Sequence, residues 1–248
     1  MRPILVLLRK DFTYFRRDRG SVILTFLVPF ALMYVFGQIF GIHLGKGGYS
    51  GSQLIGGWAM QFLLFALTFS AASLFHEKDN GIFQRILSGP VPRSTILWSK
   101  FLYGIALGLL QLMVLFSAGS ALFGLPLLAH LPLLALVCLF AAASCSAFGM
   151  LLASVARTPE MARSLSTFTI LLMSALGGAW FPVAYMPPVM QQVSRLTPVY
   201  WSISGFGQAL GDRASLTGLL PTVGVLVAMA AGLLGVAWWQ FRRGTIFE

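Results

Sequence analysis

Charged residues are scarce in this 248-residue sequence: they make up 10% of the chain, whereas hydrophobic residues make up 57%. A soluble domain carries about 25% charged residues, so a soluble chain of this size could not cover its core with so few. The mean hydropathy is +0.82, and apolar runs of roughly twenty residues, enough to cross a bilayer core, separate the charged stretches. This scarcity excludes a soluble protein and predicts a polytopic membrane protein.

The sequence also has few of the residues that metal sites and many enzymes require. Its two cysteines, Cys138 and Cys145, lie roughly 10 Å apart along a helix, which is too far for a disulfide within the chain, so we interpret them as small core residues. The three histidines, His43, His76 and His130, have no metal-ligand spacing. We therefore expect neither a metal site nor a catalytic site.

Ionisable residues are absent from the middle of the predicted spans, where a carrier coupled to protons or sodium ions usually needs them. No Walker A motif is present. The nearest segment, residues 41–47, is one residue short between its glycines and has Gly47 where the motif needs Ser or Thr. We therefore expect this chain to bind no cofactor and another chain to supply the energy.

Six apolar spans predict an all-α membrane fold with a single transmembrane domain over residues 1–248. Residues 3–18 form an amphipathic basic helix suited to the membrane interface. Residues 157–163 are expected to form a polar turn, and prolines interrupt the amphipathic, aromatic-rich residues 182–216 on the external side. The spans are predicted at about residues 21–40, 53–75, 95–123, 133–155, 165–181 and 219–241.

Basic residues are distributed unequally between the two sides of this topology. Fourteen of the 17 Lys and Arg residues fall on the side of the chain ends, and three on the other side. Positive charge accumulates on the cytoplasmic side of membrane proteins. We therefore expect both termini to be cytoplasmic in a multi-pass protein of a bacterial-type inner membrane. This topology explains the net charge of +10, and we expect no nucleic acid partner.

The polar segment after the second span contains a short amphipathic helix, which Pro90 and Pro92 end. An apolar stripe among charges on a cytoplasmic loop fits a groove in a partner protein. The alternatives are that the helix rests on lipid or packs against the N-terminal helix. The stripe consists of Ile82, Phe83, Ile86 and Leu87.

Small and amide side chains inside the spans predict helix packing. The pairs Gly37/Gly41, Gly104/Gly108 and Ala142/Ser146 have the spacing that allows helices to approach closely. We favour packing within the chain over a dimer seam for each pair. Two intramembrane amides are candidates either for a mutual hydrogen bond or for lining a substrate path, and we favour packing; they are Gln61 and Gln111.

Three segments resemble the membrane subunits of the ATP-binding-cassette (ABC) type-2 exporter permeases, and the likeness covers nearly the whole chain. Residues 9–19, followed by a span with Pro29, look like the family's interfacial elbow helix. Residues 77–93 are similar to its cytoplasmic segment with the coupling helix. Residues 177–187, continuing to 196–200, look like its external exit from span five, which implies short external re-entrant helices over residues 182–216 that cap the translocation path. An interfacial aromatic belt is the alternative for this last segment.

The resemblance implies roles for particular residues. The elbow helix includes Arg9, Lys10, Phe12, Arg16 and Arg17. Coupling to an ATPase subunit falls to Glu77, Asp79, Gly81, Ile82, Phe83, Arg85, Ile86, Leu87 and Pro90. The external cap includes Phe181, Pro182, Met186, Pro187, Pro198 and Tyr200.

The resemblance also implies a function. The chain would be the non-catalytic membrane subunit of an exporter from the drug-efflux-like branch, paired with a second copy or a related permease. Two separate ATPase subunits would hold ATP and magnesium, and the cargo would be hydrophobic or amphipathic. The alternatives are a permease for lipid-linked glycan or polysaccharide, a passive pore without an ATPase, and an intramembrane enzyme using His76 and Glu77.

Overall fold

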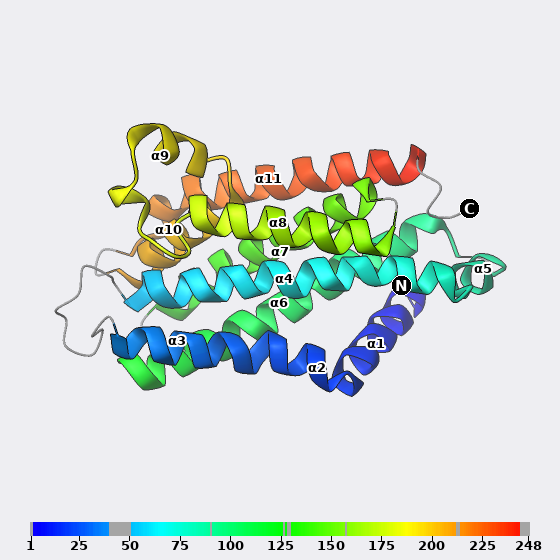
Figure 1. Ribbon diagram of the computed structural model, residues 1–248, viewed down its shortest axis with the longest axis horizontal. Coiled ribbons are helices and arrows are strands. Elements are labelled where there is room, and N and C mark those ends of the chain that lie inside the picture. Colours follow the sequence, from blue (N-terminus) through cyan, green and yellow to red (C-terminus); the bar gives the residue numbers. More distant parts are fainter. Residues whose placement is uncertain are drawn as a thin grey trace.

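The computed structural model of the chain is a bundle whose long helices run along a common axis (Figure 1). It describes residues 2–39, 51–89, 91–125, 127, 130–156, 158–211 and 214–243, and all regular structure within them is helical, as predicted. The elements are α1 (Arg2–Arg17), α2 (Arg19–Val22), η1 (Ile23–Leu27), α3 (Val28–Ile39), α4 (Gly51–Asp79), α5 (Ile82–Leu87), α6 (Arg93–Phe123), α7 (Leu131–Val155), α8 (Pro159–Leu176), η4 (Val183–Tyr185), α9 (Pro188–Ser194), α10 (Pro198–Leu210) and α11 (Leu216–Arg243).

Four helical stretches among the described residues are long and apolar enough to cross a membrane: Arg19–Ile39, Ser94–Phe123, Leu131–Val155 and Leu216–Arg242. Helices α4 and α8 run alongside them in the same bundle (Figure 1). Helix α1 and the last turns of α11 lie at the end of the bundle that carries α5, whereas α9 and α10 lie at the opposite end (Figure 1). The bundle therefore separates the candidate coupling segment from the candidate cap.

The first apolar stretch changes its hydrogen-bond pattern where the chain meets Pro29. A proline has no N–H, and its ring clashes with the carbonyl four residues earlier, here that of Thr25. The N–H of Val28 bonds instead to the carbonyl of Ile23, five residues back, so that η1 is a π-helical turn. The proline is thus accommodated inside a continuous helical path, as predicted from the sequence.

Helix α8 begins earlier than predicted. The expected polar turn at 157–163 is wrong for its described part from Pro159 onward, which is already helical. Thr158 caps the helix by accepting a hydrogen bond from the N–H of Met161 at 3.1 Å, and Pro159 occupies the first helical position. The helix ends at Leu176, before the predicted end of the span at residue 181.

Helix α7 lies at the centre of the bundle and is buried without interruption over residues 141–150. Its small side chains meet the predicted glycine pair of α6. A Cβ on Gly104 would overlap Ser146 Oγ, and a Cβ on Gly108 would lie 2.9 Å from Ala142 Cβ. Close packing within the chain is therefore confirmed for both pairs. Gly37 packs against the ring of Phe123, while Gly41 lies outside the described residues.

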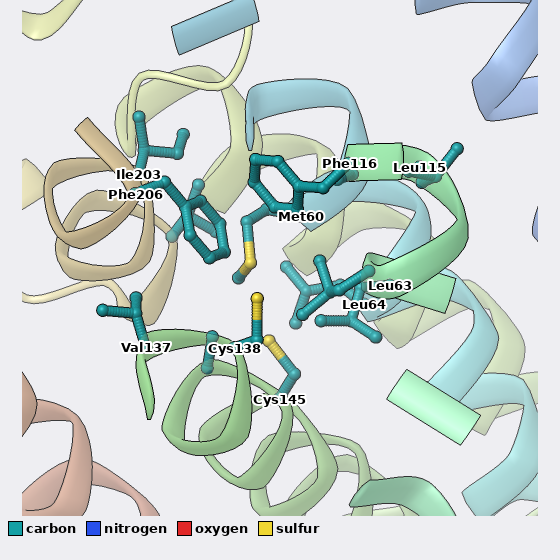
Figure 2. Close-up of a cluster of buried hydrophobic side chains, with 14 of the residues drawn as sticks. Met60, Leu63, Leu64, Leu115, Phe116, Val137, Cys138, Cys145, Ile203 and Phe206 are labelled. Carbon is teal, nitrogen blue, oxygen red and sulfur yellow. The ribbon is translucent and has the colours of Figure 1, made fainter. Parts of the chain in front are cut away.

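Large side chains from α4, α6, α7 and α10 fill the space between these helices (Figure 2). Phe116 of α6 and Phe206 of α10 meet edge to face, with ring centroids 4.8 Å apart. The sulfur atoms of Met60, Cys138 and Cys145 point into the same cluster (Figure 2), and both cysteines are free and buried, as predicted. Helix α10 is thereby part of the core.

We predict that Gly108→Val destabilises the protein, because the added side chain must displace the backbone of α7. Overpacking of this kind costs about 1–3 kcal/mol. The thermal unfolding midpoint of the purified protein in detergent measures the effect. Gly232→Val on α11 is the matched control, since a Cβ there meets nothing within 4 Å. An equal loss of stability in both variants would contradict close packing at Gly108.

Candidate functional site

Helix α1 packs its apolar stripe against the start of α6 and against η1. Phe12 meets Tyr103 edge to face with centroids 4.9 Å apart, and Phe15 meets Phe26 at 6.2 Å. Val6 on the opposite side is exposed. Because the stripe contacts protein, α1 is a part of the bundle and carries its charged residues to a fixed position.

Four charged side chains converge where α1 meets α4 and α6, and we call them the ion cluster. Lys100 Nζ of α6 lies 2.7 Å from Glu77 Oε1 of α4 and 3.0 Å from Asp11 Oδ1 of α1. Lys10 Nζ lies 2.6 Å from the same Glu77 oxygen and 3.3 Å from Asp11 Oδ1. Two cations and two anions make the cluster neutral, so each charge removed from water has a partner.

Burial makes this pairing obligatory. The side chains of Lys100 and Asp11 are only 4% and 6% exposed, and an unpaired charge at such a position is strongly unfavourable. Burial alone would raise the pKa of Glu77, but the charges of Lys100 and Lys10 outweigh it and hold that pKa below its ordinary value. The pKa of Lys10, which burial alone would lower, is raised by Glu77 and Asp11. Both shifts favour the charged forms of Glu77 and Lys10.

The ion cluster also fixes the starting point of α5. Glu77 lies in the last turn of α4, and α5 begins at Ile82. Between them Gly81 has φ 67°, a left-handed conformation that glycine adopts without strain. One tight turn thus connects α5 to Glu77, which pairs with Lys10 of α1 and Lys100 of α6.

The predicted coupling residues fall into different environments. Arg85 is exposed, and Ile86 packs against a second core cluster of the chain itself. Glu77, predicted to take part in coupling to the ATPase subunit, lies buried, and its carboxylate binds Lys10 and Lys100 of the chain itself. The side chain of His76, the other residue of the catalytic alternative, lies outside the described part of the structure. The side chains of Asp79, Phe83 and Leu87, and all of Pro90, lie outside the described part of the structure.

At the opposite end of α4, three residues on one face hold the loop that follows α8. Gln53 Nε2 donates to the carbonyl of Gly178 at 2.7 Å, and Gln61 Oε1 accepts from Trp180 Nε1 at 2.6 Å. Between them, a Cβ on Gly57 would overlap the carbonyl oxygen of Ala179. We call this contact the loop clamp.

The amide pair of the sequence analysis does not form. Gln61 bonds to Trp180, which favours packing over path lining for this residue. Gln111 is fully buried, and neither its Nε2 nor its Oε1 has a hydrogen-bond partner among the described residues. The expected alternative of a bond between the two amides was therefore wrong.

The predicted cap residues are divided between an exposed part and a buried part. Pro198 is buried and Tyr200 is half-buried on α10, which packs against α4, α7 and α11. The half-buried positions before α9 are Pro182 and Met186. The exposed ones are Phe181 and Pro187.

Sequence reasoning missed most of the residues that form the ion cluster and the loop clamp. In the sequence, Asp11 is a single acidic residue in a basic helix. Lys100 is grouped with the charged residues beside a span, so neither residue is recognised as part of a buried pair. The signal that could have found Lys100 is its position seven residues inside α6, with apolar neighbours on both sides. A lysine at such a depth needs an acidic partner.

We predict that Lys100→Met destabilises the protein by about 3–5 kcal/mol, because it leaves two buried carboxylates to share Lys10. The double variant Lys100→Met/Glu77→Gln recovers a large part of this loss, since Lys10 and Asp11 then form a neutral pair. Thermal unfolding in detergent and protease cleavage of α1 measure both effects. The control is Arg9→Met, which removes an exposed cation from α1. A Lys100→Met protein as stable as wild type would contradict the role of the ion cluster.

We predict that Gly57→Val displaces the loop after α8, because the new side chain meets backbone atoms of Ala179. A cysteine introduced at position 181 measures the displacement: its thiol is expected to react faster with a labelling reagent in the Gly57→Val variant than in wild type. Gly207→Val on α10 is the control, since a Cβ there meets nothing within 4 Å. Equal labelling rates in the Gly57→Val variant and wild type would count against the loop clamp.

Comparison with known proteins identifies the chain's relatives. Residues 2–210 match the family described as ABC-2 type transporter. The inner membrane transport permease YadH of Escherichia coli K12 is 30% identical over 214 residues, which cover 85% of this chain and 82% of that protein.

A second relative is the linearmycin resistance permease protein LnrN of Bacillus subtilis strain 168. It is 25% identical over 175 residues, which cover 71% of this chain and 45% of that protein. The match thus spans less than half of LnrN. The family match covers the ion cluster and the helices from α1 to α10, and the chain therefore belongs to the ABC-2 type transporter family, as a membrane subunit of an ABC transporter.

Proposed function

We propose that this chain is one transmembrane half of an ATP-driven exporter. It pairs with a second copy or a related permease, and two ABC ATPase subunits that carry ATP and magnesium bind at the α5 end of the bundle. The observation that carries the proposal is the ion cluster, which joins the elbow helix α1 to the turn that leads into α5. A displacement of α5 therefore acts on both α1 and α6, whose lysines bind Glu77.

The proposed topology has six spans and two cytoplasmic termini. Helices α4 and α8 add two spans to the four apolar stretches, and their parallel course in the bundle supports this count (Figure 1). The excess of Lys and Arg on the side of the chain ends supports the orientation. In this topology α5 faces the cytoplasm, whereas the loop clamp, α9 and α10 face outward.

Helix α4 connects the two functional ends in the proposed mechanism. It has 29 residues, which corresponds to about 43 Å of helix. Glu77 binds the ion cluster at one end, and Gln53, Gly57 and Gln61 hold the loop clamp at the other. ATP-driven closure of the ATPase pair displaces α5, and α4 carries that displacement to the external loop, which opens the outward path.

The proposed cargo is a hydrophobic or amphipathic molecule. The interior of the bundle is apolar and aromatic, and such walls bury ligand surface without many specific hydrogen bonds. The relative named for linearmycin resistance supports drug-type cargo over lipid-linked glycan.

Copurification with the ATPase subunit tests the proposal. We predict that the tagged chain, isolated in mild detergent, retains a partner with a Walker A motif and ATP turnover. Arg85→Glu reduces this retention about tenfold, because Arg85 is exposed on α5 and a charge reversal in an interface repels the former partner. Thermal unfolding of the variant chain remains unchanged, since the side chain contacts solvent.

Arg163→Glu serves as the matched control, since it reverses another exposed arginine at the same end of the bundle but outside α5. Retention equal to wild type in the Arg85→Glu variant would place the docking surface elsewhere. An oligomer of this chain alone, with transport in vesicles and no ATP turnover, would establish the passive pore instead.

A further inference from the structure

An apolar groove opens on the side of the bundle where α6, α7 and α11 meet. It encloses about 320 Å³. Phe101 of α6, Leu139 of α7 and Leu234 of α11 are among its lining residues, all of which are apolar. Nothing in the lining can bind a polar ligand through side-chain hydrogen bonds, so the groove suits a hydrocarbon chain.

One stripe of α11 continues from the groove to a cation. Val227, Ala231 and Leu234 line the groove, and Trp238 and Arg242 follow at spacings of four residues. Spacings of three and four residues place all five on one side of a helix. Trp238 is half-buried and Arg242 is exposed. An apolar surface thus leads past an aromatic ring to an exposed guanidinium.

The tryptophans give the depth of the groove in the membrane. Trp238 lies four residues from Leu234, and the exposed Trp98 lies three residues from Phe101, so both are one turn from the groove. Tryptophan is enriched at the level of the lipid headgroups. From Trp238 to Val227 the helix rises about 16 Å, close to one leaflet of a hydrocarbon core ~30 Å thick. The groove, which α11 lines from Val227 to Leu234, therefore lies within a single leaflet.

We propose that this groove binds one acyl chain of an anionic phospholipid, whose phosphate is held by Arg242. The lipid comes from the leaflet at the α5 end of the bundle. Guanidinium groups bind phosphate oxygens through paired, charge-assisted hydrogen bonds. The binding site is independent of the cargo and of the ATPase, and it places a lipid against the helix that carries the buried Lys100.

The lining of the groove and the charge beside it favour a lipid over a second copy of the chain. The groove has a volume of about 320 Å³ and is lined by apolar residues alone, which suits a hydrocarbon chain. The charge of Arg242 also favours a lipid, because this residue lies at the level of the headgroups and attracts an anionic lipid.

Native mass spectrometry of the purified full-length chain tests the proposal. The protein is equilibrated with equal amounts of palmitoyl-oleoyl phosphatidylglycerol and phosphatidylcholine, and the lipids that survive detergent exchange are counted. Wild type is expected to retain one phosphatidylglycerol. Ala231→Phe fills the groove and abolishes this retention. Ala228→Phe is the matched control, since Ala228 is also exposed on α11 but does not line the groove.

Arg242→Gln provides a second test that leaves the groove unchanged. It is expected to lower the preference for phosphatidylglycerol over phosphatidylcholine about fivefold, the contribution of one basic residue near an anionic membrane surface. Equal lipid retention by wild type and Ala231→Phe would overturn the proposal. An equal loss in Ala228→Phe, an unchanged preference in Arg242→Gln, or a disulfide between two copies through a cysteine at position 231 would also overturn it.

Discussion

The close approach of α7 to its neighbours is the constraint on which this bundle depends. Within a membrane the hydrophobic effect does little to hold helices together, so that packing and interhelical hydrogen bonds must do so. The residues of α7 from Ala141 to Met150 are buried. Ser146 Oγ donates to the carbonyl of Phe101 at 3.0 Å, and Ser144 Oγ to that of Leu226 at 2.9 Å. Small side chains and hydroxyl groups thus bring α6 and α11 against one central helix.

At one end of the bundle, the ion cluster joins the helices by pairing of buried charges and not by close packing. A neutral set of buried charges contributes little stability compared with apolar packing, but it penalises every arrangement that separates its members. Glu77, Lys100 and Asp11 belong to three elements that are distant in sequence. If α1 moved away from α6, Asp11 would leave Lys100 with one partner fewer in an apolar setting. The cluster therefore specifies the position of α1 more than it adds to the strength of the fold.

The sequence was most informative where a single segment determines the outcome. The long apolar runs predicted the helices, the basic amphipathic pattern predicted α1, and the charges with Pro92 predicted the short α5. The start of α8 was missed because Glu160 and Arg163 suggested a polar turn, although Thr158 and Pro159 form an N-terminal cap.

Contacts between distant segments could not be predicted in the same way. Lys100 and Asp11 are 89 residues apart, and Trp180 and Gln61 are 119 residues apart. A single sequence contains no signal that pairs such residues, because each of them also fits a simpler interpretation. Lys100 fits a charge at the edge of a span, and Gln61 fits a general packing amide.

The two polar anchors of α4 differ in kind, and the difference follows from their positions. Glu77 binds two lysines near the end of the bundle, where the long side chain of Lys10 is still 37% exposed and reaches water. Gln53 and Gln61, nearer the other end, form neutral hydrogen bonds with Gly178 and Trp180. Leu63, Leu64 and Leu67 between the anchors are buried in the apolar core. An ion cluster in that middle region would require deeper desolvation of four charges. Polar anchors at the ends and apolar packing between them therefore attach α4 at both ends, which is what the proposed mechanism requires of a helix that moves as one body.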